Sequence, residues 1–275
     1  MNKLWRALLV LAALGVAATG YAYRQATATP IVRRATVALS AWPAGARPVT
    51  ALLISDIHVA GPDMPPARLA GIVAQINALR PDVVLIAGDL ISEKRVATRL
   101  YSMADAIAPL ATLRPRLGTF AVLGNHDHWY DPQGARIALA KAGVRLLDND
   151  AAVAGPLVVG GLDDAHTGRD DLPRTIRRMQ FGRGARVVLS HSPDPFPGVP
   201  RGYGLMLAGH THCGQIAPWP VGPILTMSRF GRRYACGMVR ERGNTLVVGA
   251  GVGTSGLPLR LGAPPDMWLL TLAGA

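Results

Sequence analysis

Residues 51–58 read ALLISDIH, an apolar run followed at once by polar side chains. The run Ala51–Ile54 is short and uncharged, which is typical of a strand buried in an α/β sheet. Asp56 and His58 stand at alternate positions just past its end, so both side chains can turn toward the same point. This stretch predicts a buried strand whose carboxyl end carries a carboxylate and an imidazole.

Apolar runs that end in polar residues recur four more times along the chain. They are Val83–Ala87 before Gly88 and Asp89, Phe120–Leu123 before Gly124, Asn125, His126 and Asp127, Val187–Leu189 before Ser190 and His191, and Leu205–Ala208 before Gly209, His210, Thr211 and His212. In α/β sheets, functional groups gather just beyond the carboxyl ends of the strands. We therefore expect these five strand ends to meet at one site.

The other patterns complete an α/β architecture. Further strands are predicted at Val144–Leu147, Leu157–Val159, Leu246–Val248 and Trp268–Leu272, and helices at Pro66–Leu79, Arg99–Leu113 and Gln133–Ala142. Strands alternate with helices at first and then follow one another closely. This order favours an α/β sandwich of two sheets flanked by helices.

The N-terminal residues 1–23 are predicted to form a membrane anchor or a signal peptide. The mostly apolar stretch that begins at Leu4 is about long enough to span a bilayer as a helix. The alternative is cleavage at the small residues Ala26, Thr27 and Ala28. Residues 24–47 are predicted to be a tether with one short strand at Ile31–Leu39, and residues 48–275 to be the folded body.

The basic residues on the two sides of the apolar stretch favour opposite orientations in a membrane. Lys3 and Arg6 favour a cytoplasmic N-terminus, whereas Arg24, Arg33 and Arg34 favour the reverse. We expect a single-pass membrane anchor with an extracytoplasmic body.

Composition excludes several classes of protein. The 275 residues are 49% hydrophobic and 17% charged, so general disorder is excluded. Cys213 and Cys236 are too few for a disulfide framework or a four-cysteine zinc site. A net charge of +12 fits nucleic acid, a membrane surface or an anionic substrate. With only 5% aromatic residues and no nucleic-acid motif, we expect no nucleic-acid partner.

The polar residues at the strand ends are of the types that bind metals. Five of the seven histidines stand there, beside Asp56, Asp89 and Asn125: His58, His126, His191, His210 and His212. Imidazole, carboxylate and amide oxygen form a mixed set suited to Mn, Fe, Zn, Co or Ni. Each motif alone also fits a turn or a helix cap, and His210, His212, Cys213 and Cys236 could together form a structural zinc site.

Taken in order, these motifs resemble the calcineurin-like metallophosphoesterase superfamily. The resemblance covers residues 48–272, and Cys213–Gln215 and Gly251–Ser255 are similar to a bacterial branch that often carries an N-terminal membrane segment. It implies a four-layer α/β/β/α fold, a two-sheet β-sandwich flanked by helices. Cys213 replaces a glycine of that branch and is expected to add a thiol near the metals.

The resemblance also implies a role for each residue. Asp56, His58 and His212 would hold one divalent metal ion, Asn125, His191 and His210 a second, and Asp89 would bridge them; His126 would be the general acid and Asp127 would orient it. The ions would be Mn, Fe, Zn or similar.

The implied reaction is hydrolysis of a phosphodiester or pyrophosphate bond by a hydroxide that two metals activate. The substrate would be a small molecule or a lipid. The alternative is a UDP-2,3-diacylglucosamine-type pyrophosphate hydrolase, which acts on a lipid-linked substrate and needs a body that faces the cytoplasm.

Some remaining residues receive less specific expectations. Asp163 and Asp164 are predicted to form a turn, His128 and His166 to lie on the surface or substrate rim, and Gly249–Gly253 to form a tight loop. Two arginine clusters fit either a solvated face or an anion contact: Arg174, Arg177 and Arg178, and Arg229, Arg232 and Arg233.

Overall fold

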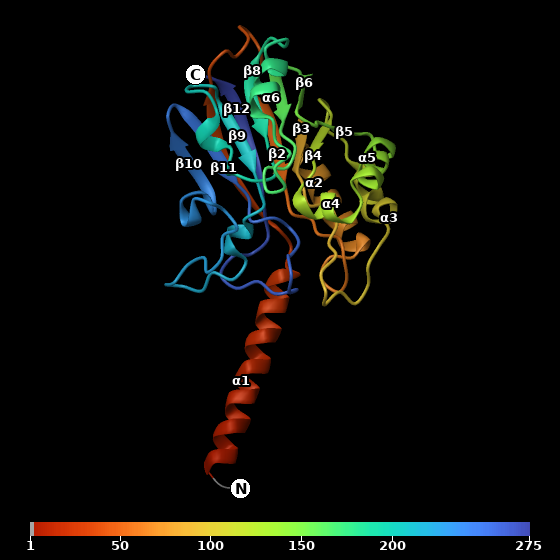
Figure 1. Cartoon of the computed structure of the whole chain (residues 1–275), viewed down its shortest axis with the longest axis vertical. Coiled ribbons are helices and arrows are strands. Elements are labelled where there is room, and N and C mark those ends of the chain that lie inside the picture. The colour runs from red at the N-terminus through yellow and green to blue at the C-terminus, as the bar shows by residue number, and fades with distance from the viewer. Residues whose placement is uncertain (1–2) are drawn as a thin grey trace.

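The computed structural model describes residues 3–275, and two six-stranded mixed sheets form their centre (Figure 1). The first sheet has the order β1 (Ile31–Leu39), β12 (Asp266–Gly274), β2 (Val49–Ile54), β3 (Val83–Ala87), β4 (Thr119–Val122) and β5 (Val144–Leu146). The second has the order β10 (Gly237–Glu241), β11 (Asn244–Val248), β9 (Leu205–Ala208), β8 (Ala185–Leu189), β7 (Leu157–Gly161) and β6 (Asp150–Ala154).

Parallel strands make up the middle of both sheets. β2, β3, β4 and β5 run parallel in the first sheet, as do β7, β8, β9 and β11 in the second. Antiparallel pairs occur where β12 meets β2, where β6 meets β7 and where β10 meets β11. The carboxyl ends of the parallel strands within each sheet therefore lie along one edge.

Strand β3 shows why its apolar run is uninterrupted. Val83, Leu85 and Ala87 pack into the core between the two sheets, with Phe120, Val187 and Leu207 among their partners in that core. Val84 and Ile86 face the other way, into the core beneath the helices. Because both faces of the sheet are covered, alternate residues of the strand are equally apolar.

Helices and short turns form the two outer layers. α2 (Pro66–Leu79), α3 (Met103–Ile107), η1 (Ala108–Thr112) and α5 (Pro132–Lys141) cover the first sheet, and α6 (Leu172–Met179), η2 (Phe196–Gly198) and η4 (Gly231–Tyr234) cover the second. α4 (Asn125–Tyr130) and η3 (His212–Gly214) begin at the strand ends. The predicted four-layer α/β/β/α architecture is thus confirmed.

All the strands predicted from the apolar runs are present, as is the helix Pro66–Leu79. The predicted helix Arg99–Leu113 is shorter and divides into α3 and η1, because Pro109 stands at the start of η1 and has no backbone N–H to continue α3. Among the α-helices and strands of the described residues, four were not predicted: β6, β10, α4 and α6.

Helix α1 (Lys3–Ala26) leaves the body as a single long helix (Figure 1). Among the described residues it is the one helix long and apolar enough to cross a membrane, and this fits a single-pass anchor. Its last turn is packed on the body, where Ala22 and Ala26 are buried. Beyond it, the strand expected within the tether is present as β1, which lies at the edge of the first sheet and pairs with β12 along all nine residues.

A buried ion pair joins the loop after β3 to the loop before α2. Lys94 Nζ lies 2.5 Å from Asp63 Oδ1, and both side chains are fully buried. Thr254 Oγ1 donates to the other Asp63 oxygen at 2.7 Å. The network ties three loops together beneath the edge of the sheet.

Replacing Lys94 by methionine would leave Asp63 as an unpaired buried charge. We expect Lys94→Met to lower the free energy of unfolding by about 3 kcal/mol, measured by denaturant titration in detergent micelles. The double variant Asp63→Asn/Lys94→Met removes both charges and should recover most of this loss. A single variant as stable as the parent chain would contradict the prediction.

Candidate metal centre

The strand-end residues have an unusual backbone conformation. Asp56, His58 and Asp89 have φ angles of 49°, 50° and 54°, in the left-handed region, and His210 and His212 have 69° and 51°. For a residue with a side chain this conformation costs about 1–2 kcal/mol. Five strained residues at one edge indicate a site at which the surrounding structure holds the backbone for a function.

Backbone hydrogen bonds between the loops hold this conformation. The N–H of Asp56 donates to the Gly88 carbonyl at 3.1 Å, and that of His58 to the Asp89 carbonyl at 2.9 Å. The N–H of His210 donates to the Asp56 carboxylate at 2.9 Å and so joins the second sheet to the first. Gly209 is required there, because a Cβ atom would overlap the Asp56 carboxylate.

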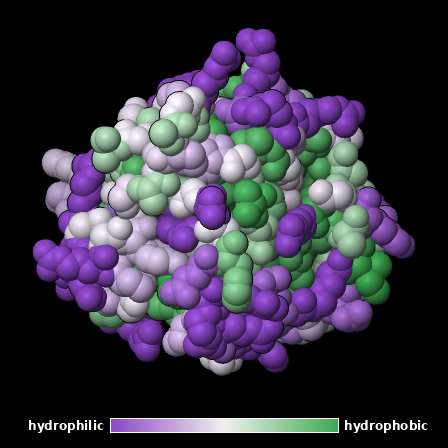
Figure 2. All heavy atoms as spheres, turned by 90° about the horizontal axis from the view of Figure 1, so that it is seen from above, coloured by the Kyte–Doolittle hydropathy of each residue, from purple (hydrophilic) through white to green (hydrophobic). Residues whose placement is uncertain are grey.

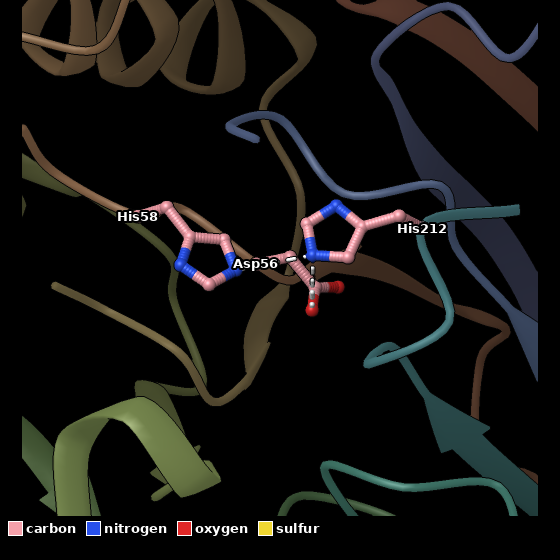
Figure 3. A group of neighbouring side chains, drawn as sticks. All are labelled: Asp56, His58 and His212. Atoms are coloured by element: carbon pink, nitrogen blue, oxygen red, sulfur yellow. Dashed lines mark hydrogen bonds and ion pairs between the residues drawn. The ribbon is translucent and has the colours of Figure 1, made fainter. Parts of the chain in front are cut away.

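One group of side chains consists of Asp56, His58 and His212 (Figure 3). The Nε2 atoms of His58 and His212 lie 3.1 Å apart, and His212 Nε2 is 3.5 Å from Asp56 Oδ1. All three residues are buried.

A second group lies beside it and contains His191, His210 and Asn125. His191 Nε2 is 3.1 Å from Asn125 Oδ1 and 3.0 Å from His210 Nδ1. Asp89 stands between the two groups, with Oδ2 at 3.4 Å from His58 Nε2 and 3.2 Å from His191 Nε2. The structure thus brings together all seven residues that the sequence predicted as metal ligands.

The donor set fits cations. Burial lowers the pKa of His58 and His212 well below the usual value, which disfavours charged rings, and the Nε2 atoms of the two rings face each other. The buried Nδ1 atom of His58 has no hydrogen-bond partner. Burial raises the pKa of Asp56 to about 6, since a carboxylate there lacks solvation. Divalent cations bound here would accept electron pairs from the imidazole nitrogens and carboxylate oxygens that lie this close together.

Glu93 was missed by the sequence analysis and contacts His126. Both Glu93 carboxylate oxygens lie 2.8 Å from His126 Nδ1. Burial disfavours a charged His126, but the Glu93 hydrogen bond and the charge of Asp89 raise its pKa above the usual value. The only signal in the sequence is an acid four residues after Asp89.

Asp127 does not occupy the position expected for it. Its carboxylate accepts from the backbone N–H groups of Leu90, Ile91 and Gly124, at 2.8, 3.3 and 2.9 Å. It therefore anchors the start of α4 and the loop after β3, and Glu93 is the carboxylate beside His126. This corrects the expectation that Asp127 orients His126 directly.

Three residues near the rim of the site, Asp164, His166 and His128, test the less specific expectations. The predicted turn is present, because Asp164 accepts from the N–H groups of His166 and Thr167. His166 lies at the rim, with its ring 4.8 Å from that of His210. His128 is not a surface residue: its side chain is 4% exposed and its Nε2 lies 2.6 Å from Asp163.

The two cysteines form a disulfide. Cys213, directly after His212, is bonded to Cys236 beyond η4. This corrects the expectation of a thiol near the metals and removes the structural zinc alternative. The sequence offered only the cysteine count and the expected extracytoplasmic location as signals.

The glycine-rich segment 249–253 is a tight loop, as predicted. Val252 and Gly253 donate to the carbonyls of Ser55 and Asp56 at 3.1 and 2.8 Å. Arg260 is fully buried behind it, donates to the Ala250 and Gly253 carbonyls and lies 3.3 Å from His212 Nδ1.

The chain belongs to the calcineurin-like phosphoesterase family, whose model matches residues 49–214. A "Transmembrane protein with metallophosphoesterase domain" of Danio rerio is 30% identical over 98% of this chain. The chain spans 62% of the length of that relative. An "Uncharacterized metallophosphoesterase YkuE" of Bacillus subtilis is 30% identical and covers 74% of this chain and 72% of its own length.

Among solved structures, a 5′-nucleotidase precursor from Thermus thermophilus is similar over 82% of this chain and 55% of its own, with 16% identity and a TM-score of 0.47. The family is one of hydrolases that act on phosphoric esters with two divalent metal ions, and the two His/Asp groups described above are where this chain could hold them.

The disulfide should contribute to stability and to the position of η3. We expect the double variant Cys213→Ala/Cys236→Ser to lose about 3 kcal/mol of unfolding free energy, because the bridge restricts the unfolded chain. Denaturant titration of the parent chain with and without reductant is the matched control. A parent chain insensitive to reductant, with a variant of equal stability, would contradict the expectation.

Proposed function

We propose that this chain hydrolyses a phosphodiester or pyrophosphate bond, with two divalent cations at the groups described above. The position of Asp89 carries the proposal, since one of its oxygens lies within 3.4 Å of a histidine of each group. When bound, divalent cations neutralise phosphate charge and lower the pKa of water.

The assignment of ligands follows the two groups. Asp56, His58 and His212 would hold one cation, Asn125, His191 and His210 the other, and Asp89 would contact both. His191 is oriented by its Nδ1 atom, which lies 2.8 Å from the Ala87 carbonyl and leaves Nε2 facing the centre.

His126 is the general acid of the proposal. Its Nε2 atom points away from Glu93 and lies 3.4 Å from Ser255 Oγ at the edge of the pocket. From there it can donate a proton to the oxygen that leaves phosphorus. Glu93 is a positioning residue, because it contacts the opposite nitrogen of the ring.

The body is proposed to lie on the extracytoplasmic side. The Cys213–Cys236 disulfide supports this side, since disulfides persist in oxidising compartments. Lys3 and Arg6 before the apolar helix support the same orientation. The UDP-diacylglucosamine alternative needs the opposite orientation and gains no support from the relatives described above.

The direct test is hydrolysis of methyl para-nitrophenyl phosphate by the full chain in detergent with added manganese. We expect turnover by the parent chain and its loss in Asp89→Asn, which keeps the side-chain shape but removes the charge. Metal content measured on both proteins should fall with activity. Absence of turnover by the parent chain, or full turnover by the variant, would overturn the proposal.

The general-acid role predicts a dependence on the leaving group. His126→Ala should lower turnover of methyl phenyl phosphate by about 100-fold or more, and that of the para-nitrophenyl ester much less, because nitrophenolate leaves without a proton. Glu93→Gln should show the same pattern more weakly, with recovery in Glu93→Asp. Equal losses on both esters would refute the general-acid role.

Membrane orientation is tested with the chain fused at Ala275 to a reporter that is active only outside the cytoplasm. We expect activity from this fusion, and none from the same reporter when it is fused before Met1 of the full chain. The reverse pattern would place the body in the cytoplasm and contradict the proposed side.

A further inference from the structure

A loop between η3 and η4 exposes a cluster of apolar side chains. Trp219 is 92% exposed and Leu225 is 70% exposed, and Val221, Ile224 and Met227 are each more than half exposed. Scattered apolar residues are ordinary on a protein surface, but five within one short segment mark an interaction surface. We call residues 219–227 the apolar loop.

The apolar loop is attached to the part of the body that receives α1. Ala217, just before the loop, donates to the Leu261 carbonyl at 2.7 Å. The residue before Leu261 is Arg260, which donates its N–H to the carbonyl of Ala22 in the last turn of α1 at 3.0 Å. Figure 1 shows the blue loops of this region beside the end of α1, at the level where the helix leaves the body.

A second exposed apolar pair lies in another loop that is joined to the end of α1. Tyr23 of the helix donates to the Pro62 carbonyl, and the neighbouring Gly61 donates to the Arg99 carbonyl at 2.8 Å. In that same loop Val96 and Leu100 are 47% and 51% exposed. The point where α1 leaves the body is therefore flanked by apolar side chains from two loops.

Between the apolar loop and the metal-ligand residues lies a pocket of about 410 Å³. It is lined by apolar side chains of the loop, Ile224, Leu225 and Met227, and by Ile216 and His212. The His210 ring, one residue from this lining, lies 3.1 Å from the Met227 carbonyl. A ligand could thus place an apolar chain against the loop and a phosphate at the histidines.

The end of the body away from α1 offers a control position. Figure 2 shows that end, with hydrophilic residues around much of its rim and hydrophobic residues across the centre and right-hand part of the view. Phe181, 85% exposed, follows α6 and precedes the start of β8, which is the end of that strand away from His191. It therefore offers a matched exposed residue remote from α1.

We propose that the apolar loop lies in the interface of the bilayer that α1 spans, and that it turns the metal-ligand edge toward phosphoesters carried by membrane lipids. Burial of these side chains in the interface removes apolar surface from water, and Trp219 is a residue type that favours this depth. The substrate class rests on the proposed phosphoesterase function, whereas the position of the loop does not.

The position is tested with the full chain in phosphatidylcholine nanodiscs that contain a doxyl-labelled lipid as quencher. Val221→Cys and, as the control, Phe181→Cys carry a bimane fluorophore, and the native cysteines are protected by their disulfide. We expect loss of most fluorescence at residue 221 and none at residue 181. Equal quenching at both positions, or cross-linking of two copies through Cys at 221 without quenching, would overturn the proposal.

The substrate class is tested with two esters that share one leaving group. Hexadecyl para-nitrophenyl phosphate is presented in nanodiscs and methyl para-nitrophenyl phosphate in solution. Trp219→Ser/Val221→Ser should lose about tenfold in turnover of the hexadecyl ester, since it removes buried apolar area, and keep its turnover of the methyl ester. Phe181→Ser should change neither.

The outcomes separate the two proposals. Equal turnover of the hexadecyl ester by the double variant and the parent chain would overturn the lipid substrate class. Hydrolysis of neither ester by the parent chain would overturn the phosphoesterase function, and the quenching would still decide where the loop lies. Melting curves of all variants check that the fold is retained.

Discussion

The structure depends on keeping strand-end residues in a left-handed backbone conformation at the edge where two sheets meet. Asp56, His58 and Asp89 adopt it although a residue with a Cβ atom disfavours this conformation. Such a conformation persists only where the surrounding structure holds it. Hydrogen bonds between the loops keep the backbone in this conformation. The loop after β2 donates to the loop after β3, and the loop after β9 donates to the Asp56 carboxylate. The unfavourable backbone conformation of each proposed ligand is therefore stabilised by hydrogen bonds from the neighbouring loops. The polar residues at the strand ends supply these hydrogen bonds, whereas the strands themselves are apolar because both of their faces are buried.

The same edge receives the N-terminal helix. Arg260 lies behind the His212 ring with its guanidinium on backbone carbonyls, and its backbone N–H donates to the last turn of α1. The Cys213–Cys236 bond restrains the residue next to His212 from the other side. One residue, Arg260, thus contacts both the last turn of α1 and His212, and the disulfide begins at the residue directly after His212. Under the proposal above, this closeness would place the site beside substrates carried by the bilayer.

Most of the sheet could be predicted from the sequence, because apolar runs and the residues that follow them are local patterns. The seven proposed ligands could be predicted as well, because the order of these patterns resembles that of a known family. The elements that escaped prediction had weaker local signals. β6 reads DAAVA and begins with an acid, and its pairing with β7 decides its conformation. α6 is a short helix rich in arginine whose buried residues are Thr175 and Met179. The roles of Asp127 and Glu93 also escaped, because only the path of the loop after β3 decides which carboxylate reaches His126.

By itself, the sequence determined the class of fold, the family, the set of metal-binding residue types and the apolar helix, since each is written in a short continuous pattern. Tertiary structure decided what depends on distance between remote residues. It joined Cys213 to Cys236, placed β1 beside β12, gave His126 the partner Glu93 and set the apolar loop next to α1. The physical reason is that the spacing of residues along the chain determines which face of a helix or strand each side chain lies on. The contacts between helices and strands, in contrast, depend on how the whole core packs.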